Sequence, residues 1–543
     1  MRRFQLSIRF VRWAALCCLS TSSALAQGQA ASEPAQALGP VLDLVMAEHM
    51  FNRFGFGARP EELQAVVGKR STELFDLWVA TSGMPEKPAP FYYNEWDYGY
   101  DANSLEVEGA PINKLPLEQQ IRRQSAFRMK DRQQFRAYMD EVFDQMVGAP
   151  SPLRARLALF WHGFFPTSSK TVLRRYELIL QYHLLRSQAL GGFDDLLRGI
   201  VKDPAMLSYF DNDTNSKTHP NENFARELME LYSLGVNNYT EVDVREAART
   251  LTGFQGETGV FVFDEDLHDF GEKTILGQTG KFDGADLVEI LLQQDACSRH
   301  VSRRLLTWME GVPPEPERLE LYAQLMRDLD YEITPWLRQL AGDPEFFRPE
   351  VIGTRVQGPI EFLVGASHRL EAQNGSTFLF FAATLAGQQF YAPPSVKGWD
   401  EGPAWISASG MTTRGNCVGL LLGHLQEHMR EEGADELQPQ ARGRINKLSS
   451  ELRAYGLRPP DLARTARAEL GFKAEDEELI EWFAQAYLAR APTEDTLQSL
   501  QREVLWCREH FDVRGPLLGS EEANRILSHL AYTLLSSPIA QLG

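Results

Sequence analysis

Residues 221–234 read Asn-Glu-Asn-Phe-Ala-Arg-Glu-Leu-Met-Glu-Leu-Tyr-Ser-Leu, and no other stretch shows the folding pattern of the chain as well. Three apolar residues recur at the i, i+4, i+7 spacing of one helix face: Phe224, Leu228 and Leu231. Three polar residues repeat this spacing on a second face: Asn223, Glu227 and Glu230. A helix of this kind packs on other helices through its apolar face. The stretch therefore indicates a helical protein with carboxylates gathered along a separate face.

Helical spacing recurs along most of the chain. It predicts helices over residues 60–81, 117–147, 152–164, 172–188 and 479–489. Strand-like alternation is confined to short pieces such as Val260–Phe263. Thr240 and Asp243 form a capping box that starts a further helix, and residues 235–238 form the turn before it. We expect a mainly α fold, a large multi-helical single unit with a few short strands.

No clear linker divides the chain. Residues 27–40, rich in Ala, Gln and Pro, are expected to be a flexible leader. We expect a main helical domain over residues 41–430, which carries the motifs described below. A smaller helical C-terminal portion, residues 431–543, is expected to pack on it.

The first 26 residues are typical of a cleavable signal peptide. They contain four arginines and no acid, an apolar core over Trp13–Leu19, and the small-residue cleavage site Ala24-Leu25-Ala26. We therefore expect a periplasmic or secreted protein, cleaved near Ala26. The longest apolar stretch after that point, Phe378–Gly387, is too short to cross a bilayer, so no transmembrane anchor is expected.

The composition is acidic. The 543 residues include 55 Lys and Arg and 74 Asp and Glu, a net charge of −19, which becomes −23 without the four arginines of the signal peptide. Nucleic acid and anionic membranes are attracted by basic surfaces, so neither is an expected partner. Beyond the signal peptide the cysteines are Cys297, Cys417 and Cys507, which are not spaced as paired metal ligands. Two alternatives follow for these cysteines: three buried free thiols, or one disulfide and one free thiol.

An ordered series of short motifs runs through the chain. It comprises Phe160-Trp161-His162, Asp203–Leu207, Asn221-Glu222-Asn223, Ala225–Leu231, Leu234-Gly235-Val236, Tyr239-Thr240-Glu241 with Asp243, Ala247–Gly253, His268-Asp269, Lys273–Gly277 and Pro393–Trp399. From about His49 to Pro538, this series resembles the bacterial family domain of unknown function 1800 (DUF1800). In this chain the family's Trp-His-Asn-His is Trp161-His162-Gly163-Phe164, so one histidine is missing.

The resemblance implies an exported, mainly helical protein without an assigned reaction. It also implies a partnership with a second exported family, domain of unknown function 1501 (DUF1501), which is similar to sulfatases and alkaline phosphatases.

The densest group of polar residues lies between Asp211 and Lys273. Its motif residues are Asn221, Glu222, Asn223, Arg226, Glu227, Glu230, Tyr239, Glu241, Asp243, His268, Asp269 and Lys273. If the helices turn them into one cleft, a hydrolase site would result, with or without a divalent metal ion as cofactor. Its catalytic candidates are Glu227, Glu230, Asp243, His268 and Asp269. The alternative is structural, with helix caps and an ion pair between Glu222 and Arg226.

Two spacings within the chain match metal-binding motifs. Positions 1, 3, 5 and 12 of an EF-hand-like calcium loop are occupied by Asp211, Asp213, Asn215 and Glu222. Ser216 replaces the usual Gly at position 6, and a capped turn is the alternative. The second spacing is the H-x-x-E-H form of a zinc peptidase, in which His424 and His428 would share zinc with Glu503. The alternative there is a helix packed closely through Gly415, Gly419 and Gly423.

Aromatic residues give the remaining candidates. Trp399 and Trp405, which follow the motif residue Lys397, could form a platform for a sugar, with a packed Trp-Pro corner as the alternative. His162 lies in an aromatic run and is expected to be a hydrogen-bonded core residue.

These observations favour an extracytoplasmic accessory or binding protein. It would act on envelope or extracellular polymer, with polysaccharide as a possible ligand and a DUF1501 protein as a possible partner. A hydrolase built on the acidic group between Asn221 and Asp269 is the alternative, and a zinc peptidase at His424 and His428 is the weaker one.

Overall fold

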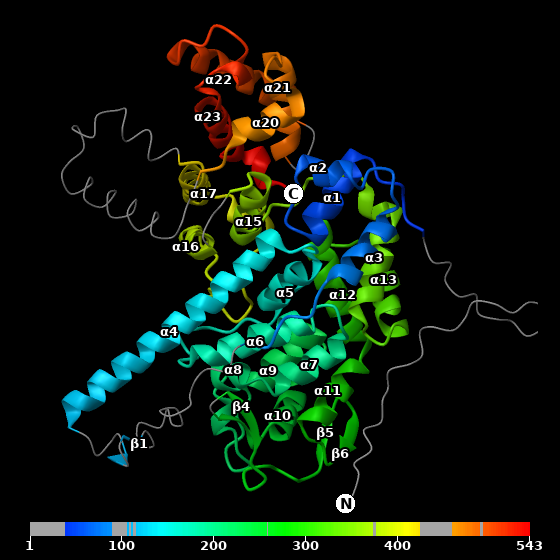
Figure 1. The fold of residues 1–543 in the computed structure, drawn as a ribbon. Helices are drawn as coiled ribbons and strands as arrows, with labels where there is room; N and C mark the ends of the chain where they lie inside the picture. The colour runs from blue at the N-terminus through cyan, green and yellow to red at the C-terminus, as the bar shows by residue number, and fades with distance from the viewer. Residues whose placement is uncertain are drawn as a thin grey trace, which may run out of the picture. The chain divides into compact units, whose positions relative to one another are not determined.

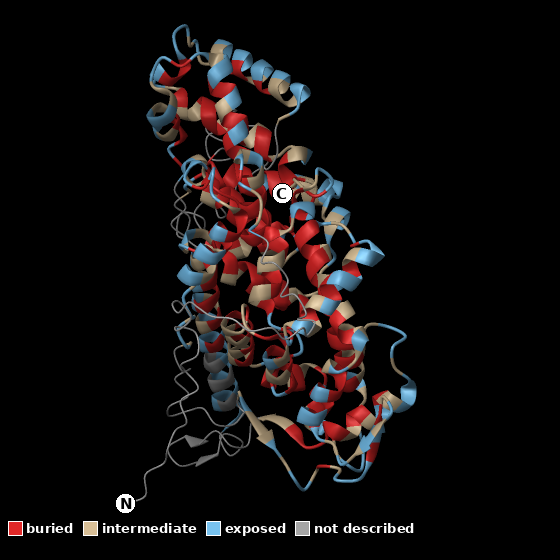
Figure 2. Ribbon diagram, turned by 90° about the vertical axis from the view of Figure 1, so that its right-hand side faces the viewer, coloured by how far each residue is buried: buried red, intermediate tan, exposed pale blue. Residues whose placement is uncertain are grey.

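The computed structural model describes residues 38–88, 106–107, 110–111, 116–257, 259–372, 376–423, 459–488 and 492–543. Residues 38–543 form one compact unit. This unit is mainly α, as predicted, and its few strands form short antiparallel pairs. The apolar core is continuous through the packed helices, whose buried faces are shown in red in Figure 2.

The predicted helix over residues 60–81 is wrong in one respect, because the structure contains two helices there. They are α2 (Pro60–Gln64) and α3 (Ser71–Thr81), which follow α1 (Leu44–Phe54). Gly68 separates them, with a φ of +85° that glycine adopts readily. The backbone of Leu42 pairs with residues 68 and 69, through Gly68 N to Leu42 O and Leu42 N to Lys69 O, both at 2.9 Å. This tertiary pairing takes the place of helical hydrogen bonds.

The next helices surround an aromatic core. They are α4 (Leu117–Gly148), α5 (Leu153–Phe164), α6 (Arg175–Ser187), α7 (Phe193–Val201) and α8 (Pro204–Tyr209). α4 is the long cyan helix of Figure 1, and its C-terminal half packs on α5, α6, α15 and α16. Within the core, Trp161 contacts Phe164, Phe165 and Phe193 with ring centroids 5.5–6.1 Å apart.

The predicted helix over residues 221–234 is confirmed from Asn223 to Leu234, whereas Asn221 and Glu222 precede it. α9 (Asn223–Met229) continues into a wider π turn, η3 (Glu230–Leu234), where the Ser233 hydroxyl donates to Leu228 O at 2.7 Å. α10 (Glu241–Thr250) starts at the predicted capping box, with Thr240 N donating to Asp243 Oδ2 at 2.8 Å and Asp243 N to Thr240 Oγ1 at 3.2 Å. α9 and α10 pack against each other.

Short hairpins and 3-10 turns complete this half of the fold. The hairpins are β1 (Glu106–Val107) with β2 (Ala110–Pro111), β3 (Phe254–Glu257) with β4 (Val260–Phe263), and β5 (Lys273–Ile275) with β6 (Gln278–Gly280). Phe254 is paired with Phe263 across the second hairpin. The 3-10 turn η2 (Asn212–Thr214) packs on α8 and β3.

The second half is again helical. It contains α11 (Gly284–Leu292), α12 (Asp295–Glu310), α13 (Pro316–Asp328), α14 (Ile333–Gly342), η4 (Pro344–Phe347), α15 (Pro359–Arg369), α16 (Ser376–Leu385), η5 (Gly402–Trp405) and α17 (Ala408–Leu421). The last elements are α20 (Leu462–Leu470), α21 (Asp476–Tyr487), α22 (Glu494–His510), η6 (Leu517–Gly519), α23 (Ala523–Leu535) and η7 (Pro538–Gln541).

The C-terminal residues return to the start of α15. Gln357 N donates to Gln541 O, and Gly543 N donates to Arg355 O, each at 2.8 Å. Buried Arg414 of α17 donates to both Gln357 O and Gln541 Oε1. The last residues of the chain therefore help to fix the segment that precedes α15, in the middle of Figure 1.

Candidate functional site

The predicted catalytic acids are distributed over separate contacts. Half-buried Glu227 and Glu230 lie one turn apart, and the pKa of Glu227 is raised by burial and by Glu230, against Arg226 and Lys397. Glu230 accepts a hydrogen bond from the Tyr239 hydroxyl at 2.5 Å. Lys397 of the Pro393–Trp399 motif is thus near the carboxylate row of α9.

Asp243, His268 and Asp269 have other partners, within α10 and in the residues that follow it. Asp243 caps its own helix and accepts from Leu276 N at 2.7 Å. Asp269 pairs with Arg249 at 2.7 Å, and buried His268 lies 2.8 Å from Thr252 O through its Nδ1 atom. Four of the five predicted catalytic residues therefore have separate hydrogen-bond or ion-pair partners, and the catalytic role of all five stays a prediction.

The other polar motif residues hold loops and helix ends. Arg226 bridges Glu222 and Glu241, and the side chain of Asn221 accepts from Asn223 N and donates to Asp211 O. Lys273 is buried, and its Nζ atom donates to the carbonyls of Asp269, Gly271 and Phe282. Three hydrogen bonds satisfy all three ammonium protons.

Asp213, Asn215 and Glu222, three of the four candidate calcium ligands, have side-chain contacts within the protein. Asp213 accepts from Gly256 N at 2.7 Å, and Glu222 pairs with Arg226 at 3.1 Å. Asn215 is buried, donates to Asn212 Oδ1 and Ala248 O, and accepts from Asn221 N. Asp211 has a φ of +55°, in the left-handed region. These contacts form an ordered, capped turn, and calcium binding there stays a prediction.

The zinc candidates His424 and His428 lie outside the described residues. Glu503, the proposed third ligand, pairs with His529 at 2.9 Å. Across residues 38–423 and 459–543, gaps excepted, no three His, Cys, Asp or Glu side chains form a group that could hold a metal ion. The three cysteines there, Cys297, Cys417 and Cys507, are buried free thiols.

A pocket brings together parts of the chain that are far apart in sequence. Its lining includes Leu159, Phe160 and Gly163 of α5, Trp308 of α12, Arg355, Val356, Gly358 and Glu361 around the start of α15, and Gln388, Trp399, Asp400, Glu401, Gly402 and Trp405. About 50 Å³ inside it is open to the centres of water-sized molecules. One water needs roughly 10–15 Å³ on this measure, so the enclosed space holds a few waters, and a larger ligand would enter only in part.

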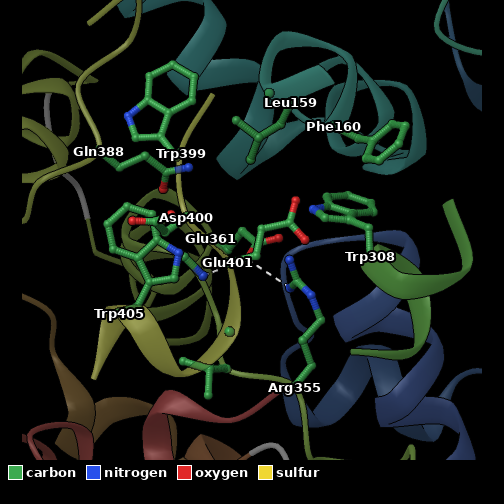
Figure 3. A pocket seen from close by; sticks show the side chains of 14 residues that line it. Leu159, Phe160, Trp308, Arg355, Glu361, Gln388, Trp399, Asp400, Glu401 and Trp405 are labelled. Carbon is green, nitrogen blue, oxygen red and sulfur yellow. Dashed lines mark hydrogen bonds and ion pairs between the residues drawn. The ribbon is translucent and has the colours of Figure 1, made fainter. Parts of the chain in front are cut away.

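Three tryptophans shape this tryptophan pocket. In Figure 3 the indoles of Trp399 and Trp405 lie on one side and that of Trp308 on the other, with carboxylate and guanidinium groups between them. Trp399 and Trp405 are half-buried, whereas Trp308 is only 6% exposed. Gln388 accepts from Ile360 N at 2.9 Å through Oε1, so its Nε2 amino group serves as a donor at the wall.

A close backbone approach places Trp399. Gly398 has a φ of +88°, and a Cβ atom there would lie 2.5 Å from Gly163 O. His162 packs behind the indole, with ring centroids 5.1 Å apart, and stacks on Phe390 at 4.8 Å. Its Nε2 atom accepts from Tyr391 N at 3.4 Å, and burial lowers the pKa of His162 to about 3. His162 is thus a neutral core residue that supports the pocket wall.

Charged groups form the floor of the pocket. Glu361 is 3% exposed, pairs with Arg156, and accepts from Arg355 Nη1 at 2.8 Å and Gly358 N at 2.7 Å. Burial raises the pKa of Glu361, but Arg156 and Arg355 outweigh burial and bring it to about 2. Both guanidiniums lie over the face of Trp308, at 4.3 and 5.1 Å from its ring centroid. Such cation–π contacts fix the indole.

Sequence reasoning identified only two of the three indoles. It missed Trp308, Arg355, Glu361 and Gln388, which come from three separate segments: α12, the start of α15, and the chain after α16. The one local signal was Pro359 at the first position of α15 followed by Glu361 at the third, a helix-start pattern that gives no sign of a pocket.

Comparison with known proteins gives one match. The family model described as "Protein of unknown function (DUF1800)" matches residues 49–541. No curated protein and no solved structure matches. Within the described residues, no helix combines the length and the apolar character needed to span a membrane.

Proposed function

The chain belongs to the DUF1800 family of proteins of unknown function, and we propose that it is an exported accessory protein that binds polysaccharide in the tryptophan pocket. The pocket is lined by indoles together with hydrogen-bond donors and acceptors. A sugar ring presents apolar C–H faces and a rim of hydroxyls, so it needs both kinds of surface.

The observation that carries the proposal is the placement of three indoles around polar side chains. Trp308 is fixed by two buried arginines, so this wall is formed before any ligand arrives. A preformed site loses less conformational entropy on binding. Asp400 and Glu401 at the rim supply hydrogen-bond acceptors, and Gln388 supplies a donor.

The compartment and the partner are parts of the same proposal. The signal peptide over residues 1–26 supports export to the periplasm or the outside, with cleavage near Ala26. Polysaccharide of the envelope or the extracellular matrix is the polymer found there. A DUF1501 protein is the proposed exported partner, and co-purification from periplasmic extract with the tagged protein tests that association.

The binding experiment uses variants of the two half-buried indoles. Isothermal titration calorimetry would measure the affinities of neutral, acidic and amino-sugar tetrasaccharides for the wild type and for Trp399→Ala and Trp405→Ala. We expect each variant to lose about tenfold in affinity, since a well-packed aromatic contact contributes roughly 1–1.5 kcal/mol.

The matched control is Trp506→Ala. Trp506 is 49% exposed and lies on α22, and it does not line the pocket. Its loss should leave sugar affinity unchanged. Absence of binding to every sugar, or equal losses in all three tryptophan variants, would overturn the proposal.

The hydrolase remains an alternative because Glu227 has a raised pKa and faces Lys397. Release of reducing ends from the same tetrasaccharides, abolished in Glu227→Gln and retained in Trp405→Ala, would favour it over a binding function.

A further inference from the structure

Four buried arginines surround the floor of the tryptophan pocket. They are Arg53, Arg156, Arg355 and Arg414, with exposures of 0%, 1%, 8% and 1%. Among the described carboxylates, only Glu361 forms an ion pair with any member of this arginine cluster. The cluster therefore carries more positive than negative charge.

A second buried acid that acts on Arg53, Glu310, already has two arginine partners of its own. Its Oε1 atom pairs with Arg318 and its Oε2 atom with Arg348, the latter at 2.9 Å. Arg53 and Arg414 bind neutral oxygens instead: Arg53 donates to Val351 O, and Arg414 to Gln357 O and Gln541 Oε1. Arg53 Nε and Nη1 and Arg414 Nη2 are buried without a hydrogen-bond partner.

Buried charge of one sign is costly because the interior screens it poorly. Burial, Arg355 and Arg156 lower the pKa of Arg53 by more than Glu361 and Glu310 raise it, consistent with incomplete compensation. Arg355 connects this charge to the pocket, since it belongs to the cluster and also lines the pocket.

The two acids at the pocket rim are exposed to solvent, unlike the buried arginine cluster. Asp400 and Glu401 are exposed, so water and salt screen them. Arg304 partly offsets Glu401, since Glu401 raises the pKa of Arg304 against the effect of burial. Arg355 is the one cation among the described residues that line the pocket, beside Glu361 and the two rim acids, but the buried charges of the arginine cluster are screened less than those of the rim acids.

We infer that the sugar unit held in the pocket carries an oxyanion, a carboxylate or a sulfate ester, which lies against Arg355 as a second counter-ion of the arginine cluster. This inference rests on the proposed function and names its substrate class. An arginine fork suits either oxyanion, because its N–H groups match a planar or tetrahedral set of oxygens.

The test compares tetrasaccharides of galacturonate, sulfated galactose, galactose and galactosamine by calorimetry at low and at physiological salt. We expect at least one acidic tetrasaccharide to bind roughly tenfold more tightly than galactose, with the advantage falling as salt rises. The acidic tetrasaccharide with the higher affinity, galacturonate or sulfated galactose, shows whether the site prefers a carboxylate or a sulfate ester.

Two variants separate this inference from the proposed function. Arg355→Met should reduce the acidic-to-neutral affinity ratio to about one. Because Arg355 also supports Trp308, the affinity for galactose should fall too, but by less than that for the acidic sugar, whereas a misfolded variant would bind neither. Asp400→Asn, at an exposed position, should raise that ratio about twofold to threefold by removing a repulsive charge.

Equal affinity for acidic and neutral sugars, or preference for galactosamine, would overturn the inference and leave the proposed function standing. Binding of none of the four would overturn both.

Discussion

Arg355 Nη1 donates to Glu361 Oε2 at 2.8 Å inside the protein, where Glu361 also pairs with Arg156. One carboxylate thus joins α5, the start of α15 and the floor of the tryptophan pocket. Because both partners are buried, removal of the acid would leave two guanidiniums uncompensated.

Glu361→Gln should therefore lower the free energy of unfolding at neutral pH by about 3–5 kcal/mol. The pKa of Glu361 is about 2 in the folded protein, below its ordinary value of 4.5, so its contribution is present above pH 4.5 and is lost as pH falls toward 2. Urea unfolding at pH 7 and pH 3.5 should show a smaller difference between variant and wild type at the lower pH.

Glu289→Gln is the matched control, since Glu289 pairs with Arg198 at the surface with 52% of its side chain exposed. That change should cost at most about 1 kcal/mol. An equally small cost for Glu361→Gln would show that the buried pair does not stabilise the pocket floor.

Asp203 makes the stability of the protein depend on pH in the opposite direction to Glu361. It is buried and accepts from Met206 N and Gln181 Nε2 through the same oxygen, Oδ2. Burial raises the pKa of Asp203 to about 7, against hydrogen bonds from Met206 and Gln181 that lower it. The folded protein therefore loses stability as pH rises from about 4 through 7.

Asp203→Asn removes this loss of stability because the amide does not ionise. Its oxygen can still accept both hydrogen bonds. We expect the variant to gain roughly 1–3 kcal/mol relative to wild type between pH 5 and pH 8, measured by urea unfolding. A difference that does not change with pH would mean that Asp203 is ionised throughout.

Lys273 has a structural role that its place in a motif did not reveal. Its ammonium group binds three backbone carbonyls between Asp269 and Phe282. Lys273→Met should destabilise the protein by about 3 kcal/mol, because these carbonyls lose their donor. Lys281→Met, at an exposed lysine of the same region, should change unfolding by less than about 0.5 kcal/mol. Similar thermal unfolding of both variants would contradict this role.

The calcium-like loop is tested by removal of metal. Since Asp213, Asn215 and Glu222 all have protein partners, we expect a chelator to leave thermal unfolding unchanged. A drop of several degrees that calcium restores, and that Asp211→Ala abolishes, would establish the loop as a calcium site.

Local patterns in the sequence are sufficient to predict the helices but not the tryptophan pocket. The capping box at Thr240 and Asp243 and the apolar row of Phe224, Leu228 and Leu231 act within a few residues, and the structure contains both helices. The break at Gly68 could not be predicted in this way, because it depends on pairing with Leu42. Spacing therefore predicts single helices and misses tertiary backbone pairing.

The tryptophan pocket depends on contacts between distant segments. Trp399 was visible as an aromatic candidate, whereas Trp308 and Arg355 become site residues only when α12 and the start of α15 meet. The acidic motif residues lie close together in sequence, but Asp243 and Glu230 have separate partners, Leu276 N and the Tyr239 hydroxyl, so their common catalytic role stays a prediction.

A crystal structure of the protein with a bound acidic tetrasaccharide would test the polysaccharide-binding function most directly. We predict a sugar ring against the half-buried indoles of Trp399 and Trp405, with its hydroxyls on Gln388 and the rim acids. A saccharide bound at full occupancy on another surface, with the tryptophan pocket holding only water, would contradict it.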